Sequence, residues 1–254
     1  GNLTVGGTGK TPHAEYIVRL LLQGGHDVAL LSRGYKRKTQ GWQMADGQST
    51  ADDIGDEPFQ IHRKYPQVRV AVDADRRHGI AMLLRQAPTP ECIVLDDAFQ
   101  HRYVKPRVSI LLTEYERPAF EDEMLPYGRL RESVHNILRA DIVIATKCPS
   151  NIKPIEYSVF DSKLNLYPAQ HRFFSRLRYE RLKPVFPELA PKAPKLSELT
   201  GDDRLLAVCG IGNPKPFIKH LKSFAAKVRI NIYPDHHEYT RKDMEVLTNR
   251  FSTM

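Results

Sequence analysis

The sequence has few of the features that define several protein classes. No apolar run approaches the roughly 20 residues of a membrane span, and there is no signal-peptide pattern, low-complexity tract or internal repeat. The three cysteines lie far apart and form neither a CxxC pair nor a Cys/His zinc spacing. These absences argue against a repeat protein, a disulfide scaffold or a zinc module, and they predict buried, reduced thiols.

The 254 residues are enough for one large or two modest domains, and the composition is that of an ordinary globular protein. The formal charge of +8 suits an acidic partner, whether phosphate, an anionic membrane face or nucleic acid, without choosing among them. The sequence begins without Met at a strand-to-loop junction and stops just after a helical pattern, so we expect it to be a fragment of a longer protein.

Short β-branched runs alternate with helical patterns such as residues 11–23 and 77–86. The runs lack polar alternation, which is typical of a parallel sheet covered on both faces. They are Val28–Ser32, Arg69–Val72 and residues 93–95, 108–112 and 142–145. The pattern predicts an α/β fold with a doubly wound, mostly parallel sheet, which collects ligands at the carboxyl ends of its strands.

A change of composition predicts a boundary after this pattern. Residues 149–168 carry scattered prolines, residues 172–178 and 183–186 could pair as a two-stranded ribbon, and a second α/β pattern begins at residues 205–209. We therefore predict a P-loop core domain at 1–160, a linker with a β-ribbon at 161–190, and a smaller α/β domain, incomplete at its end, at 191–254.

The strongest local pattern is Gly6-Gly7-Thr8-Gly9-Lys10-Thr11. Glycines let successive backbone N–H groups point at phosphate oxygens, and the helix that starts there adds its positive end. In such a loop Lys10 reaches the β- and γ-phosphates of ATP and the Thr11 hydroxyl holds Mg²⁺. Residues 4–11, from Thr4 and Val5 onward, are called the phosphate loop below.

One departure from the general P-loop pattern is visible. A glycine is expected five residues before Gly9, and Thr4 stands there instead. A glycine-rich turn before an ordinary helix is the alternative interpretation.

A P-loop also needs a carboxylate at the end of a neighbouring strand. Asp96 and Asp97 follow the apolar run 92–95. Adjacent carboxylates repel each other unless a cation is near, so we expect them to ligate the metal. Capping of the next helix is the alternative.

Three further groups are more ambiguous. Asp56, in Gly-Asp-Glu-Pro, is either functional or a helix cap, and Glu132 by itself fits a solvated charge cluster. His236 and His237 follow an aspartate; neighbouring residues point apart, so proton relay is a better interpretation than metal binding.

Taken together, the segments GNLTVGGTGKTP, LSRGYKRKTQG, GDEP, DDAFQHR, LPYGRLRES, GIGNPKPF and YPDHHEYT resemble the lipid A 4′-kinase (tetraacyldisaccharide 4′-kinase) family of Gram-negative bacteria. They run in the family's order and cover nearly the whole chain. The family shares Thr4 in its phosphate loop, so the departure above supports the resemblance.

The resemblance implies phosphorylation by ATP and Mg²⁺ of the 4′-hydroxyl of tetraacyldisaccharide 1-phosphate. It implies two α/β/α domains joined by a β-ribbon, with the active site between them, and a peripheral monomer on the cytoplasmic face of the inner membrane. The family normally has an N-terminal hydrophobic helix and a preceding strand, which this sequence does not include. The basic residues 33–38 and the arginines of 172–181 could face anionic lipid, or could simply be solvated.

The resemblance also assigns roles to residues. Asp56 matches the family's catalytic aspartate, with His236 as its partner. Asp96 and Asp97 match its metal-binding acids, and Glu132 lies in a turn that helps to hold the metal. Contacts with sugar or phosphate are implied for Tyr35, Arg76 and Arg131.

Two other functions each share a feature with this sequence. A partner-switching ATPase of the deviant P-loop type carries a signature Lys just before the glycines, where this chain has Val5. A nucleic-acid-binding module would carry a recognition helix, zinc finger or aromatic RNA-binding pattern, and none is present, so we expect no nucleic-acid partner.

Overall fold

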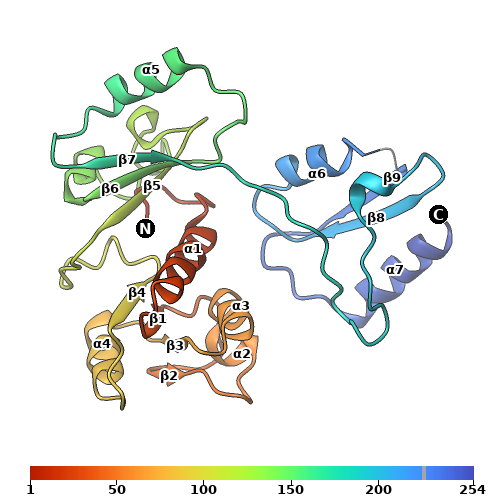
Figure 1. Cartoon of the computed structure of the whole chain (residues 1–254), viewed down its shortest axis with the longest axis horizontal. Helices are drawn as coiled ribbons and strands as arrows, with labels where there is room; N and C mark the ends of the chain where they lie inside the picture. Colours follow the sequence, from red (N-terminus) through yellow and green to blue (C-terminus); the bar gives the residue numbers. More distant parts are fainter. Residues whose placement is uncertain (225–226) are drawn as a thin grey trace. The chain divides into compact units, whose positions relative to one another are not determined.

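The computed structural model describes residues 1–224 and 227–254. The chain divides into two compact units, unit 1 at Gly1–Leu177 and unit 2 at Arg178–Met254 (Figure 1). Among the described residues, no helix has both the length and the apolar character needed to cross a bilayer.

Unit 1 contains two sheets, with strand orders β2-β3-β1-β4 and β5-β6-β7, and only the β2–β3 pair is antiparallel. The strands are β1 Val28–Ser32, β2 Gln43–Met44, β3 Arg69–Val72, β4 Cys92–Leu95, β5 Ile110–Glu114, β6 Ile142–Thr146 and β7 His171–Phe174. The helices are α1 Lys10–Gln23, α2 Ala51–Ile54, α3 Asp56–Lys64, α4 Arg76–Leu84 and α5 Pro154–Leu164, with 3-10 turns at Ala119–Glu121 and Val134–Arg139.

Strand β1 shows why the first sheet has no polar alternation. Its residues Val28 and Leu30 pack in a core with α1 and α3, whereas Ala29 and Leu31 pack on the other face with Leu83 of α4. Figure 1 shows α4 on the opposite side of this sheet from α2 and α3. Both faces are buried, which confirms the α/β fold with mostly parallel strands.

In the second sheet, residues of β5 and β6 pack against α5 in a buried core. Between the sheets runs the N-terminal segment, which forms single bridges from Asn2 to Leu112 and from Thr4 to Leu130. Because isolated bridges do not extend into a strand, unit 1 has two separate sheets where the sequence predicted one doubly wound sheet. The same segment leads directly into the phosphate loop and α1.

Unit 2 is a small α/β unit. Its strands β8 Arg204–Cys209 and β9 Lys227–Ile232 pair in parallel, and a 3-10 turn at Leu196–Glu198 precedes them. Helices α6 Lys215–Leu221 and α7 Arg241–Ser252 each contribute a buried leucine, Leu221 and Leu247.

The predicted β-ribbon and its boundaries are wrong. Residues 171–174 form β7, which extends the second sheet by pairing with β6, and residues 183–186 form no strand. A strand added to the edge of an existing sheet shares the packed face of that sheet, whereas an isolated two-stranded ribbon is only marginally stable in water. The predicted boundary at 160/161 falls inside α5, and the predicted linker therefore supplies α5 and β7 to unit 1.

Candidate active site

The phosphate loop has the backbone that anion binding requires. Gly6 and Gly9 adopt φ values of 104° and 86°, a left-handed conformation that side chains disfavour. Helix α1 begins at Lys10 without a side-chain cap on its first N–H groups. Free N–H groups at a helix start, next to a glycine-rich turn, form a site for phosphate.

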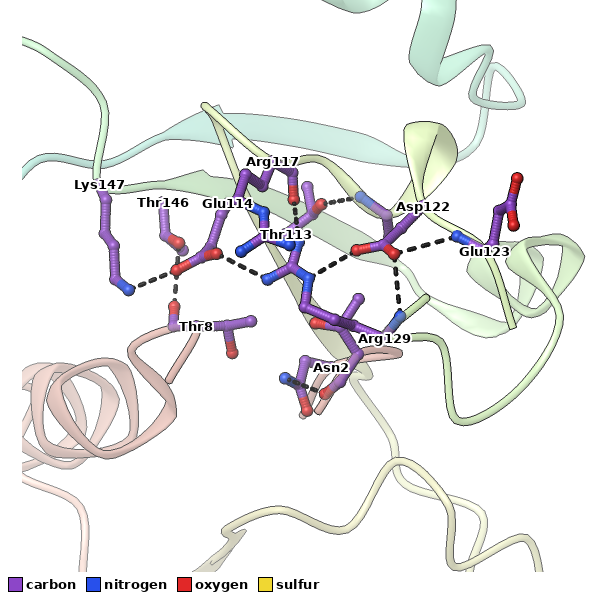
Figure 2. Close-up of polar contacts among 12 residues, drawn as sticks. Asn2, Thr8, Thr113, Glu114, Arg117, Asp122, Glu123, Arg129, Thr146 and Lys147 are labelled. Carbon is purple, nitrogen blue, oxygen red and sulfur yellow. Dashed lines mark hydrogen bonds and ion pairs between the residues drawn. The ribbon is translucent and has the colours of Figure 1, made fainter. Parts of the chain in front are cut away.

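Neighbouring segments hold this loop in place. The Val5 N–H donates to the carbonyl of Arg129 at 2.8 Å. The Thr146 hydroxyl donates to the Thr8 carbonyl at 2.9 Å (Figure 2). The Thr8 side chain is buried, and its hydroxyl finds no hydrogen-bond partner in the described part of the chain. A buried, unpartnered hydroxyl is costly by itself, so it supports a polar ligand at the loop.

Lys10 and Asp97 meet at the head of α1. The Lys10 ammonium lies 3.7 Å from one Asp97 carboxylate oxygen and 3.4 Å from the Asn2 side-chain oxygen. Arg131 lies 3.4 Å from the other Asp97 oxygen and also donates to Asn2. The acids after β4 therefore lie beside the phosphate loop, as the nucleotide-site prediction requires.

Asp96 is the most perturbed acid of the site. It is 6% exposed, and burial together with the nearby Glu57 carboxylate raises its pKa to about 6. Its carboxylate makes no ion pair with any described residue. A buried carboxylate without a cation favours a site that a metal ion completes.

Burial and then the charge of Glu57, a carboxylate in the first turn of α3, raise the pKa of Asp96. Asp56 is the first residue of that helix, and Gly55 before it has φ 90°. A Cβ at Gly55 would lie 2.9 Å from the Tyr35 carbonyl, so only glycine allows residues 33–41 to approach the start of α3 this closely. The exposed Tyr35 ring and the Asp56 carboxylate thus come from adjoining backbone segments.

Two further predicted site residues have protein partners. Arg76 is 1% exposed, donating to the Asp73 carbonyl and, at 3.3 Å, to the Asp96 carbonyl. Glu132 accepts from Gln100 at 2.8 Å and pairs with Arg139 at 2.7 Å. These contacts favour positioning roles for both residues, and their predicted contacts with substrate and metal stay predictions.

No three His, Cys, Asp or Glu side chains in residues 1–224 and 227–254 converge closely enough to hold a metal ion. Mg²⁺ in nucleotide sites is usually bound by one or two carboxylates and the phosphates themselves. Thr11, Asp96 and Asp97 fit that arrangement.

The two histidines of unit 2 have different environments. His237 lies 3.1 Å from Asp243 and stacks on Tyr233, which ties it to α7. His236 occupies a left-handed turn with φ 53°. The structure therefore gives His237 a local structural partner, and the catalytic role predicted for His236 stays a prediction. Asp56 belongs to unit 1, and the predicted pairing of Asp56 with His236 stays a prediction.

An ionic network lies at the end of β5. Glu114 pairs with Lys147 and, at 3.1 Å, with Arg129, whose Nε lies 2.7 Å from Asp122 (Figure 2). Gly128 is required here because a Cβ would meet the Glu123 carbonyl at 2.3 Å. The network fixes the Arg129 backbone, which holds Val5 and precedes Arg131 and Glu132.

Comparison with known proteins decides the family. The family model described as tetraacyldisaccharide-1-P 4′-kinase matches residues 1–254. The chain belongs to the tetraacyldisaccharide 4′-kinase family. It is 50% identical over 261 residues to the tetraacyldisaccharide 4′-kinase of Bacteroides thetaiotaomicron, covering 100% of this chain and 68% of that protein. It is 48% identical over 256 residues to that of Parabacteroides distasonis, covering 100% of this chain and 69% of that protein.

A solved structure agrees with this assignment. The fold matches the crystal structure of LpxK from Aquifex aeolicus in complex with ATP with a TM-score of 0.70 and 28% identity, over 95% of this chain and 71% of that one. The match confirms the predicted α/β fold of a P-loop kinase.

Sequence reasoning missed several residues of this 4′-kinase site. Asn2, which is fully buried, joins Lys10 to Arg131 and also accepts from Gln100 through its carbonyl. Gln100 lies inside the recognised DDAFQHR segment and could have been found there. Asn2 likewise lies inside the recognised GNLTVGGTGKTP segment, whereas Arg139 carries no local pattern that indicates its contacts.

Proposed function

We propose that this chain transfers the γ-phosphate of ATP to the 4′-hydroxyl of tetraacyldisaccharide 1-phosphate, a lipid A precursor. The observation that carries the proposal is the meeting of Lys10 and Asp97 at the phosphate loop, in a chain that belongs to the 4′-kinase family. Phosphoryl transfer mainly requires positioning and charge neutralisation, which such a loop supplies.

The nucleotide half of the site follows from unit 1. Backbone N–H groups of the phosphate loop and the start of α1 would bind the β- and γ-phosphates, and Lys10 would add a positive charge. Thr11, Asp96 and Asp97 would hold Mg²⁺, which supplies charge neutralisation to the phosphates. Arg76 and Glu132 keep these groups in place through the Asp96 carbonyl and the Gln100 side chain.

The acceptor half uses Asp56. Its carboxylate at the exposed start of α3 would orient the sugar hydroxyl and accept its proton, with His236 as its partner. Tyr35 and Arg131 would contact the sugar and its phosphate.

Membrane association is proposed as peripheral, for a monomer at the cytoplasmic face of the inner membrane, where the acceptor lipid is anchored. Part of the proposed basic surface is neutralised within the protein. Lys38 lies 2.6 Å from Asp52, and Arg172 lies 2.5 Å from Asp161. Arg176, Arg178 and Arg181 are exposed and would meet anionic lipid. Co-sedimentation with vesicles that does not depend on anionic lipid content would contradict this part.

The direct test uses γ-labelled ATP, Mg²⁺ and tetraacyldisaccharide 1-phosphate, with label on the lipid as the expected product. Asp56→Ala should lower kcat by roughly 10²–10⁴, the range for a general base, with little change in ATP affinity. Near-normal turnover in that variant would remove Asp56 from the role.

Lys10→Ala tests the nucleotide half separately. Loss of the charge at the β- and γ-phosphates should weaken both ATP binding and turnover. Intact ATP-dependent activity would refute the phosphate-loop assignment, and ATP-driven dimerisation without label on the lipid would favour a partner-switching ATPase instead.

A further inference from the structure

His13 lies in the first turn of α1, and its ring joins the phosphate loop to a distant strand. The ring nitrogen Nδ1 lies 2.7 Å from the Gly9 carbonyl oxygen, and Nε2 lies 2.9 Å from the Ser175 hydroxyl. The Gly9 carbonyl also accepts the backbone N–H of His13 at 3.2 Å. A single carbonyl of the loop is thus held by two donors from one residue.

The chemistry of these partners fixes the roles of the ring atoms. A carbonyl oxygen can only accept, so Nδ1 carries a hydrogen and donates it to Gly9. In the neutral ring Nε2 then accepts from the Ser175 hydroxyl, which can donate. The Gly9 carbonyl therefore fixes the tautomer, and the Ser175 hydroxyl, which also lies 3.5 Å from the Ala145 carbonyl, holds the other ring nitrogen.

Holding the Gly9 carbonyl also orients the amide that follows it. The Gly9 carbonyl and the Lys10 N–H belong to one planar trans peptide and point in opposite directions. Gly9 has φ 86° and no side chain, so its own conformational preferences restrict this peptide little. A fixed carbonyl thus points the Lys10 N–H away from the helix, toward where the phosphates would bind.

Ser175 is itself firmly placed. Its N–H donates to the Ala145 carbonyl at 2.8 Å, and its carbonyl accepts from Cys148 at 2.9 Å. It follows β7 directly and lies two residues before Leu177, the last residue of unit 1. The chain of contacts therefore runs from the end of the second sheet, through the His13 ring, to the phosphate loop.

We propose that His13 is a positioning residue for the nucleotide, holding the Gly9–Lys10 peptide in its phosphate-binding orientation, and that Ser175 holds the His13 ring. The inference rests on the proposed function of the phosphate loop as an ATP site. It assigns part of the affinity for the nucleotide to a contact between α1 and the residue that follows β7.

The experiment measures binding of Mg²⁺ and a non-hydrolysable ATP analogue by calorimetry, with steady-state kinetics beside it. His13→Ala should weaken analogue binding and raise KM for ATP about fivefold to tenfold, the effect of one buried hydrogen bond. KM for the lipid should not change. His13→Asn keeps a donor near the position of Nδ1 and should recover most of the affinity.

Ser175→Ala should weaken binding about two- to threefold, because the ring keeps its Gly9 contact but loses its anchor. The double variant should bind no worse than His13→Ala, since the Ser175 effect acts through the ring. His26→Ala is the matched control. It removes an imidazole contact, with Glu91 at 2.9 Å, beyond the other end of α1 and should leave analogue binding unchanged.

Unchanged analogue binding in His13→Ala, no recovery in His13→Asn, or additive effects in the double variant would each overturn the inference. If His13→Ala fails to fold, His13→Asn and Ser175→Ala test the positioning role instead.

Lys10→Ala separates the two proposals. If Lys10→Ala leaves analogue binding intact, the ATP site itself is refuted, whereas loss in Lys10→Ala with no effect at His13 refutes only the positioning role.

Discussion

In unit 1 the buried Asp96 directly follows β4, the partly buried Glu114 is the last residue of β5, and the two acids have opposite surroundings. Asp96, after β4, has no ion-pair partner among the described residues, and burial with the nearby Glu57 raises its pKa to about 6. Burial also opposes ionisation of Glu114 at the end of β5, but the hydrogen bonds and charges of Lys147 and Arg129 hold its pKa below the usual value.

The difference distinguishes an acid that is expected to bind a ligand, Asp96, from an acid that stabilises the fold, Glu114. A carboxylate whose charge is balanced by protein cations needs no bound cation, and its ion pairs connect parts of the fold. A buried carboxylate that the protein leaves unneutralised costs stability until a cation binds, and it lies where the phosphate loop ends. The comparison predicts that substitution at Asp96 affects turnover most and that substitution at Glu114 affects stability most.

The largest effect is expected at Asp96. Asp96→Asn should lower turnover by about 100-fold or more, because a metal-binding charge is lost from the transition state. A labelled-ATP assay measures this effect. Turnover within a few-fold of the unsubstituted chain would remove Asp96 from the metal site.

The same variant should change stability in the opposite direction. Because the pKa of Asp96 is raised above its ordinary 3.8, the folded chain holds a proton that the unfolded chain releases. Without nucleotide, the stability of the unsubstituted chain should fall as the pH rises from about 4 to about 6. Asn cannot ionise, so Asp96→Asn should melt higher than the unsubstituted chain at pH 8 and about equally at pH 4. Equal melting at both pH values would contradict the prediction.

Glu114→Gln tests the other half of the comparison, the contribution of the ion-paired acid to stability. It leaves Lys147 without its anion and leaves Arg129 paired with Asp122 alone in a partly buried network, and should cost about 1–3 kcal/mol of the free energy of unfolding. The exposed Glu116 two residues later supplies the control, because Glu116→Gln should cost little. Chemical denaturation compares the two variants, and equal stability would mean that the network contributes nothing.

The smallest effect is expected in unit 2, at Asp243. Hydrogen bonds from the Thr240 backbone and side chain, followed by that from His237, lower the pKa of Asp243 to about 2. A lowered carboxyl pKa contributes stability above the ordinary value of 3.8 that disappears as the pH falls toward about 2. Asp243→Asn should therefore lower the melting temperature slightly at pH 7, with the gap closing in acid. If the difference in melting temperature persists at the lowest pH, the loss of stability comes from the lost helix cap alone and not from the ionised carboxylate.

Much of unit 1 could be predicted from local sequence. The strands Val28–Ser32 and Arg69–Val72 form at the predicted residues, because a near-continuous apolar run is typical of a parallel strand buried on both faces. The phosphate loop and the acids after β4 were also predicted, since glycine conformation and strand-end placement are local properties. The prediction of the ribbon was wrong because the alternation of polar and apolar residues in 172–178 indicates a strand but not the strand with which it pairs.

The sequence alone determined the fold class, the phosphate loop, the acids that follow β4 and the family, because each depends on short runs whose residue types and spacing carry the information. Tertiary structure decided which charges are neutralised. Asn2 meets Arg131 across 129 positions, and His13 meets Ser175 across 162. Such contacts have no local signature, because a side chain's partner is set by how the sheets and helices pack and not by its neighbours along the chain.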